Sequence, residues 1–259
     1  MKKQEISVRA YGTYVDAGSI RPINEDACIA VPEFKLFGVA DGYGGNSIGD
    51  IAAKEALEKV SYFVKNGLGD SEVTLPFVYR RYLTEPGNLV FNAFLYANNE
   101  LIRKNKTAHI NGRGGASILF AFMAGNKMVF ANSGLCQAVL IRKGRVQFLV
   151  KPRSYNSLRG TFQGSWNPKW AFPIAALGHS ADLEPELFEL QVEKGDAIVL
   201  LTDGIYPRLT EDDFAESIRS IKSSKSLDIG ISEQNRRLAE IALQKGSVDN
   251  MAMITIVCG

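Results

Sequence analysis

Long apolar runs are missing from this chain. Although 46% of its 259 residues are hydrophobic, no run reaches the roughly 18 apolar residues that a membrane-spanning helix needs. The first residues, MKKQEISVRAYG, contain two lysines, but the apolar stretch of a secretory signal does not follow them. We therefore expect a soluble, cytoplasmic protein that has no membrane partner.

Cysteine, histidine and blocks of like charge are also scarce. Cys28, Cys136 and Cys258 stand far apart and form no C-x-x-C pair, which argues against a disulfide framework or a zinc knuckle. Only His109 and His179 are present, and we expect both to be ordinary surface or loop residues. The net charge is +2, with basic and acidic residues interspersed, so no nucleic-acid partner is expected.

Hydrophobic periodicity predicts the fold class. Short apolar runs separated by turn residues predict strands at 26–31, 34–40, 116–124, 127–133, 136–144, 145–150, 186–192, 197–204 and 251–259. Helical spacing predicts helices at 46–67, 88–106, 211–220 and 233–244. The short turns between strands favour antiparallel pairing. We predict one α+β domain over 1–259, in which two antiparallel sheets form a central β-sandwich flanked by helices.

One long segment has no periodicity. Residues 152–180 collect three prolines together with Trp166 and Trp170. A loop of this length inside a compact domain is usually functional or disordered. The two tryptophans are equally compatible with substrate contact and with pinning the loop to the body of the protein.

Four aspartates stand at the edges of apolar runs. Asp26 begins a predicted strand, Asp41 and Asp203 each end one, and Asp249 precedes the last. If these acids gather at one sheet end, each close pair costs about 1 kcal/mol or more in repulsion, so a positive charge must lie among them. Hard divalent cations such as Mg²⁺ or Mn²⁺ take oxygen ligands of this kind. A single Asp-Gly is more often a simple turn, whereas all four together favour a metal site.

An ordered set of short motifs identifies a family resemblance. The segments RPINED, VADGYGG, GGAS, ANSG, LLTDGIY and VDNMAMITIV occur in this order. The set resembles the metal-dependent serine/threonine protein phosphatases of the protein phosphatase 2C family, over about residues 8–258. The resemblance implies a helix-flanked β-sandwich with two Mg²⁺ or Mn²⁺ ions at one end. It also implies hydrolysis of phosphoserine and phosphothreonine in proteins by a hydroxide that bridges the ions, without a protein nucleophile.

The resemblance assigns metal ligands residue by residue. It implies that Asp41 bridges both ions and that the Gly42 carbonyl binds one of them. Asp203 and Asp249 match ligands of the first ion, and Glu25 matches a ligand of the second. These assignments use oxygen donors throughout, as hard cations prefer.

Three further residues receive catalytic roles from the resemblance. Asp26 matches an acid that holds metal-bound water, and Arg21 matches an arginine that grips the substrate phosphate. Taken alone, Arg21 is equally well explained as a solvated loop residue. Tyr43 stands where the family usually has a histidine that assists the leaving alkoxide. Because tyrosine is the weaker acid, we expect slower turnover of substrates with poor leaving groups.

The sequence departs from the family pattern at three other places. The family segment GDSR is replaced by residues 134–137, GLCQ, which implies altered packing beneath the site. Residues 111–113, NGR, replace acids expected before GGAS, so a third metal ion is doubtful. Pro207 stands where an aspartate is common, and residues 152–176 occupy the place of the family's flap.

Two other functions compete with the protein phosphatase. One is a pseudophosphatase that binds a partner through the same fold, and the other is a hydrolase of a different phosphate monoester. The compact bacterial family members resemble this chain most in length, which points to a monomer acting on targets of a serine/threonine kinase.

Overall fold

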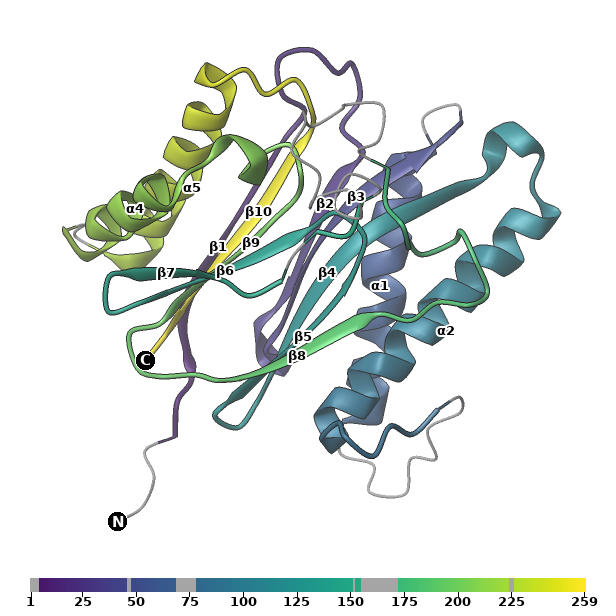
Figure 1. Ribbon diagram of the computed structural model, residues 1–259, viewed down its shortest axis with the longest axis horizontal. Helices are drawn as coiled ribbons and strands as arrows, with labels where there is room; N and C mark the ends of the chain where they lie inside the picture. Colours follow the sequence, from purple (N-terminus) through teal and green to yellow (C-terminus); the bar gives the residue numbers. More distant parts are fainter. Residues whose placement is uncertain (1–4, 46–47, 69–77, 151, 155–171, 224–225) are drawn as a thin grey trace, which may run out of the picture.

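The predicted α+β sandwich is confirmed. The computed structural model describes residues 5–45, 48–68, 78–150, 152–154, 172–223 and 226–259. Two five-stranded antiparallel sheets face each other, and pairs of helices cover their outer faces (Figure 1). In the described part of the chain, no helix combines the length and apolar composition of a membrane-spanning segment.

The first sheet joins the two ends of the chain. Its strands in spatial order are β1 (Val8–Asp16), β10 (Met251–Cys258), β9 (Ala197–Leu201), β6 (Gln137–Arg142) and β7 (Arg145–Phe148). The sequence prediction omitted β1, because this edge strand shows no clean alternation of buried and exposed residues. Position 12 of this strand is a glycine, because a Cβ there would come 2.6 Å from the Ile231 side chain.

The second sheet carries the VADGYGG segment. Its order is β2 (Asp26–Val31), β3 (Leu36–Gly44), β4 (Gly114–Ala124), β5 (Lys127–Ser133) and β8 (Glu186–Gln191). A short 3₁₀ turn, η1 (Pro32–Phe34), joins β2 to β3. The strand β3 runs four residues beyond the predicted end at 40, so Asp41 lies inside the strand and pairs with Ser117. The expectation that Asp41 ends a strand was therefore wrong.

The helices bury apolar faces against both sheets. α1 (Gly49–Gly67) and α2 (Glu85–Thr107) cover the second sheet, and α4 (Glu211–Ser223) and α5 (Leu227–Gln244) cover the first (Figure 1). α2 begins earlier than predicted because the Thr84 hydroxyl accepts a hydrogen bond from the Gly87 amide at 3.2 Å. Pro86 is tolerated in the first turn, where its missing N–H has no partner to lose. Ser226 caps α5 in the same way and moves its start before the predicted 233.

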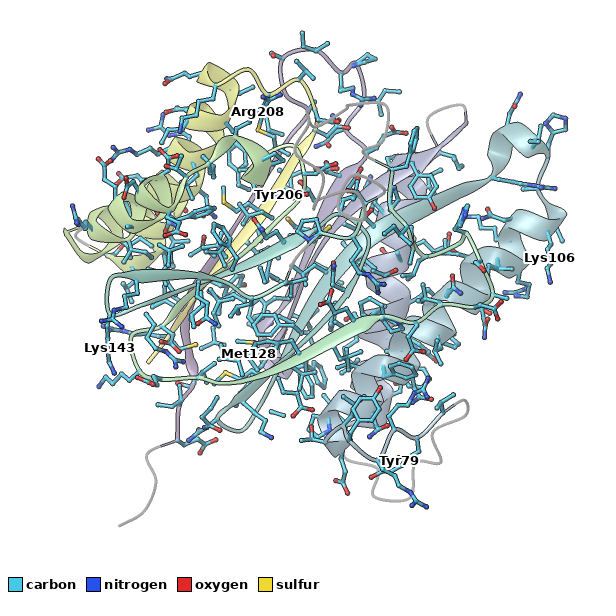
Figure 2. The ribbon with its side chains drawn as sticks, viewed as in Figure 1. Tyr79, Lys106, Met128, Lys143, Tyr206 and Arg208 are labelled. Atoms are coloured by element: carbon cyan, nitrogen blue, oxygen red, sulfur yellow. The ribbon has the colours of Figure 1, made fainter. Side chains whose placement is uncertain are left out.

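Three apolar layers hold the frame together. Aromatic and aliphatic side chains such as Phe37, Phe130 and Leu200 are fully buried between the sheets. Each fully buried side chain of this size stabilises the fold by about 1.5–3 kcal/mol. Tyr206 and Lys143 mark opposite ends of the first sheet (Figure 2). The predicted acids gather at the Tyr206 end, because β9 stops at Leu201 and Asp203 follows in the next turn.

Candidate metal centre

The centre begins with two aspartates on adjacent strands. Asp26 on β2 and Asp41 on β3 are direct partners in the antiparallel register. Like charges placed opposite each other destabilise a sheet, yet Asp26 is only 5% exposed. Its carboxylate accepts a hydrogen bond from the Thr202 hydroxyl at 2.6 Å, and Asp41 lies directly opposite on the neighbouring strand. This pair fixes the floor of the site.

Glu25 connects the floor to the start of α1. Its Oε1 accepts a hydrogen bond from the Gly49 amide at 3.1 Å, at the first turn of that helix. Its backbone carbonyl accepts the Gly42 amide at 3.0 Å. A Cβ at position 42 would overlap the Gly49 carbonyl oxygen, so only glycine fits there. The backbone thus approaches Gly42 closely from two sides, and the first turn of α1 is one of them.

Asp203 and Asp249 come from the first sheet. Asp249 forms an ion pair with the Arg21 guanidinium at 3.1 Å. The next residue, Asn250, was not singled out by the sequence, yet it organises the whole loop before β2. Its Oδ1 accepts the Glu25 amide at 2.9 Å, and its Nδ2 donates to the carbonyls of Ala17 and Ile23. An Asn after an Asp-containing turn gives no distinctive sequence signal, which explains the omission.

A cavity of about 420 Å³ joins these residues. Seven of the eight predicted site residues line it: Arg21, Glu25, Asp41, Gly42, Tyr43, Asp203 and Asp249. The eighth, Asp26, lies beneath it through its contact with Asp41. The structure thus brings together side chains from both sheets that are far apart in the sequence.

The site holds more negative charge than the described residues balance. Burial, followed by repulsion from Asp203, raises the pKa of Asp41 well above its ordinary value. Burial also raises the pKa of Asp26, against the effect of the Thr202 hydrogen bond. For Asp203, burial and then Asp249 raise the pKa to about 7, although Arg21 opposes the rise. Arg21 is the only lysine or arginine among the described residues that line this cavity.

The donor set fits hydrated divalent cations. As they stand, no three His, Cys, Asp or Glu side chains of the described residues converge closely enough to hold an ion by themselves. Mg²⁺ usually keeps several waters and is bound through only one or two carboxylates, with dehydration limited by its small size. Carboxylates spread around a wet cavity, with the Gly42 backbone on its wall, satisfy that requirement.

Tyr43 lines both the metal cavity and a second cavity beside it. Its hydroxyl lies against Gly115, where a Cβ would overlap it. Burial and then Asp41 raise the pKa of Tyr43 to about 12, so the phenol stays protonated near neutral pH.

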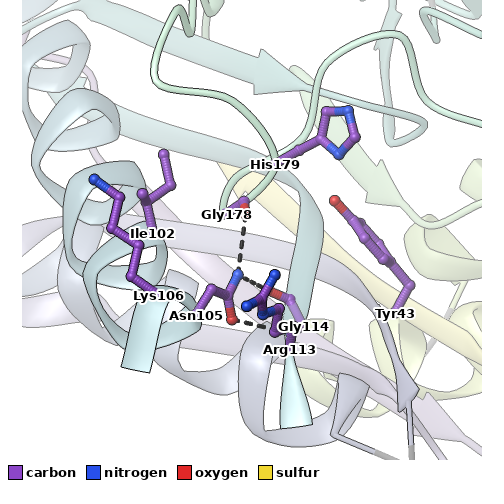
Figure 3. Close-up of a pocket in the computed structure, with 8 residues that line it drawn as sticks. All are labelled: Tyr43, Ile102, Asn105, Lys106, Arg113, Gly114, Gly178 and His179. Atoms are coloured by element: carbon purple, nitrogen blue, oxygen red, sulfur yellow. Dashed lines mark hydrogen bonds between the residues drawn. The ribbon is translucent and has the colours of Figure 1, made fainter. Parts of the chain in front are cut away.

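His179 is the functional candidate that the sequence missed. It is exposed, as expected for a loop residue, but it lines the metal cavity. Figure 3 shows the Tyr43 hydroxyl directed toward its imidazole. Nothing in the local sequence marks His179, because only the tertiary fold brings it close to Tyr43.

The departures from the family pattern have separate structural outcomes. Leu135 is buried and lines the metal cavity, and Cys136 behind it has a pKa raised by burial. Arg113 is exposed and lines the neighbouring cavity. Pro207 lies in the exposed 3₁₀ turn η5 (Tyr206–Arg208). Trp166 and Trp170 fall outside the described residues.

The described ends of the 152–176 segment border the site. Ser154 and Pro173 form an isolated antiparallel bridge, and the Ile174 amide donates to the Arg153 carbonyl at 3.0 Å. Phe172 and Pro173 line the metal cavity. The base of the predicted flap is therefore beside the acids.

Curated relatives are similar to this chain over most of its length. The Arabidopsis thaliana protein named "Probable protein phosphatase 2C 2" is 21% identical over 95% of this chain and 66% of its own length. The Listeria welshimeri "Serine/threonine phosphatase stp" is 26% identical over 93% of this chain and 92% of its own length. The Mycobacterium tuberculosis "Serine/threonine protein phosphatase PstP" is 24% identical, and the chain spans only 44% of its length.

Solved structures share the fold. The Mycobacterium tuberculosis phosphatase PstP/Ppp superposes with a TM-score of 0.76 at 20% identity, covering 98% of this chain and 99% of that one. A structure of the PstP catalytic domain in complex with two manganese ions has a TM-score of 0.74 at 19% identity, with 98% of each chain covered. The sequence profile described as Protein phosphatase 2C matches residues 22–240. With that match over most of its length, the chain belongs to the protein phosphatase 2C family.

Proposed function

We propose that the protein hydrolyses phosphoserine and phosphothreonine in proteins and requires two Mg²⁺ or Mn²⁺ ions. The observation that carries this proposal is the gathering of four carboxylates around one cavity, with Asp26 beneath it and Arg21 as the single described cation. The Listeria and mycobacterial relatives, which are named serine/threonine phosphatases, and the two manganese ions of one solved relative support the same reaction.

The ligand roles implied by the family resemblance fall on residues that line the cavity. Asp41 would serve both ions, the Gly42 carbonyl one of them, Asp203 and Asp249 the first, and Glu25 the second. When bound, two divalent ions would neutralise the acids, bind phosphate oxygens and lower the pKa of water so that it can attack phosphorus. Burial and then repulsion between the acids raise the pKa values of Asp41 and Asp203, and such ions would compensate this negative charge.

The chain's own side chains supply binding and proton positions. Arg21 now holds Asp249, and its planar guanidinium is suited to two phosphate oxygens once the charge on that acid is shared. Asp26, which accepts a hydrogen bond from Thr202, would also accept a hydrogen bond from metal-bound water. Tyr43 keeps its proton and can donate a hydrogen bond to the leaving oxygen, but it releases the proton reluctantly.

Two observations favour the second candidate, a pseudophosphatase that binds a partner. Leu135 places an apolar side chain on the metal cavity, and Tyr43 replaces the usual histidine. Against it, every matched ligand is retained at the cavity or directly beneath it. A hydrolase of small phosphate esters would use the same centre and differ only in substrate contacts.

The deciding experiment measures metal binding and hydrolysis together. Calorimetry with Mn²⁺ should detect two sites, and p-nitrophenyl phosphate should be hydrolysed with Mn²⁺ but not with EDTA. Asp41→Asn should abolish both signals, whereas Asp182→Asn, an exposed acid away from the cavity, should change neither. Metal binding without hydrolysis of any ester would favour the binding protein. A phosphopeptide rate below that of small phosphate esters would favour the small-ester hydrolase.

The wider assignments belong to the same proposal. The chain spans less than two thirds of the length of the first curated relatives it matches. We place residues 1–259 in one catalytic domain, a cytoplasmic monomer whose substrates are phosphoproteins in kinase signalling. Gel filtration and limited proteolysis test the domain and the monomer directly.

A further inference from the structure

A second cavity adjoins the metal cavity. It encloses about 430 Å³, and the two cavities share Tyr43 and His179 as a common wall. Figure 3 shows Lys106 and Ile102 on the α2 side and Tyr43 and His179 on the other. A bound segment that crosses this wall would touch both cavities at once.

The second cavity is basic where the first is acidic. Lys106 and Arg113 line it, and none of the described lining residues is an acid. Within the described chain neither cation has an ion-pair partner, and the Arg113 side chain donates one hydrogen bond, from Nε to the Ala108 carbonyl at 3.4 Å. Their neighbours on α2 differ, because Arg103 pairs with Glu100 and Lys104 pairs with Glu55. Two charges are thus left free at the cavity.

Backbone and side-chain hydrogen bonds fix the cavity floor. Asn105 Nδ2 donates to the carbonyls of Gly114 (2.7 Å) and Gly178 (3.0 Å), and its Oδ1 accepts the Gly114 amide. Two turns earlier, Asn98 accepts the Gly178 amide and donates to the Ser180 carbonyl, both at 2.8 Å. The loop that carries His179 is therefore held to α2 at two points, and the cavity is formed before any ligand arrives.

We infer that this cavity binds an acidic group of the substrate, a carboxylate or second phosphate that flanks the phosphorylated residue in the metal cavity. This inference rests on the proposed function. The unpaired guanidinium and ammonium groups match such anions, and the guanidinium can pair with two oxygens at once. An extended peptide rises about 3.3 Å per residue, so a neighbouring side chain can reach across the wall formed by Tyr43 and His179. Lys106 and Arg113 are thereby specificity-determining residues.

The test compares phosphopeptides with the Mn²⁺-loaded protein. One phosphothreonine peptide carries alanine on both sides, and a matched series places glutamate or phosphoserine at each of the three positions before and after it. We expect at least one acidic peptide to exceed the alanine peptide about tenfold in kcat/KM, mainly through a lower KM. The preference should shrink as salt is raised.

Charge variants locate the preference. Lys106→Gln with Arg113→Gln should bring the acidic-to-neutral ratio close to one, and Lys106→Glu with Arg113→Glu should favour a lysine-flanked peptide. The matched control, Arg103→Gln with Lys104→Gln, removes the same charge from the same helix end but outside the cavity, and should keep the wild-type ratio. The single variant Lys106→Gln, at an exposed position, provides the test if a double variant folds poorly.

Three outcomes would overturn the inference. They are a wild-type enzyme without acidic preference at any position, a preference that survives the glutamine variants, and an equal loss in the control. Inorganic sulfate provides a further arm, since a free anion that changes the rate through these two residues, without any peptide preference, would replace the substrate role. If the wild-type protein failed to hydrolyse p-nitrophenyl phosphate, the proposed function itself would be at fault.

Discussion

The two ends of β9 carry two aspartates with opposite surroundings. Asp196, just before the strand, is 1% exposed, and its oxygens accept hydrogen bonds from Arg142 at 2.8 and 2.6 Å and from the Glu193 amide at 2.7 Å. Asp203, just beyond the strand, lies near Asp249 and Asp41 instead. Burial and then Asp249 raise the pKa of Asp203, and the charge of Arg21 lowers it. Asp196 is satisfied by the protein, whereas Asp203 forms no ion pair with a described residue.

The partners of a buried acid separate a structural role from a functional one better than its burial does. A buried carboxylate that has its own arginine is explained by folding alone. Carboxylates that raise each other's pKa need another reason to be retained, and a divalent ion supplies it. The comparison makes opposite predictions for the two groups.

The largest expected effect is on activity. Asp41→Asn should lower metal-dependent hydrolysis of p-nitrophenyl phosphate by on the order of 10³-fold, because a shared ligand and a full charge are lost. The metal-free variant should melt at the same or a higher temperature, since repulsion is relieved. A clearly less stable metal-free variant would break the comparison.

Asp196→Asn should show the reverse. Removing this partner leaves Arg142 facing a neutral group at a buried position, and the free energy of unfolding should fall by about 3 kcal/mol. Chemical denaturation measures the loss, and kcat of the folded fraction should match the wild type. A selective loss of activity would place Asp196 among the functional acids.

Metal and pH sharpen the comparison further. Asp203 holds its proton to about pH 7 when folded but only to about pH 4 when unfolded, so unfolding releases a proton between these values. Stability of the metal-free protein should therefore fall by about 2 kcal/mol as pH rises from 5.5 to 7.5. Mn²⁺ should raise the melting temperature more at pH 7.5 than at pH 5.5. A metal effect independent of pH would contradict this assignment.

Arg21 tests the looser of the two ion pairs. Its pair with Asp249 is about half exposed, unlike the Arg142 pair, so Arg21→Lys should leave stability within about 0.5 kcal/mol. We expect kcat/KM to fall about tenfold, because lysine cannot hold two phosphate oxygens in one plane. An unchanged kcat/KM would return Arg21 to the role of a solvated loop residue.

The smallest expected effect is at Tyr43. Tyr43→His should increase turnover of a phosphopeptide by about threefold, because an imidazole donates a proton more readily than a phenol of raised pKa. Turnover of p-nitrophenyl phosphate, which has a good leaving group, should change less. A fall in phosphopeptide turnover would show that this interpretation of Tyr43 is wrong.

Most of the sandwich followed from the sequence because its buried strands are short apolar runs. β1 did not, since an edge strand with mixed exposure looks like a loop. The start of α2 depends on the capping hydroxyl of Thr84, and the start of α5 on that of Ser226. A proline near the start of α2 and a glycine near the start of α5 obscure these capping signals in the sequence.

The acids of the site were predictable, whereas their organisers were not. A single carboxylate at a strand edge is more often part of a turn, but four of them together predict a metal site. Asn98, Asn105 and Asn250 are ordinary polar residues until the fold supplies the carbonyls and amides they bind. His179 is similar, since only tertiary structure places it beside Tyr43.

Helix α2 contributes to the packing of the domain and, in our proposal, to its choice of substrate. One face of it closes the apolar layer over the second sheet, and its last turns anchor the loop that divides the acidic hollow from the basic one. Substitutions that loosen those turns should reduce substrate selectivity before they unfold the domain. We therefore expect substitutions in the last turns of this covering helix to change the choice of substrate while the proposed metal ligands keep their positions.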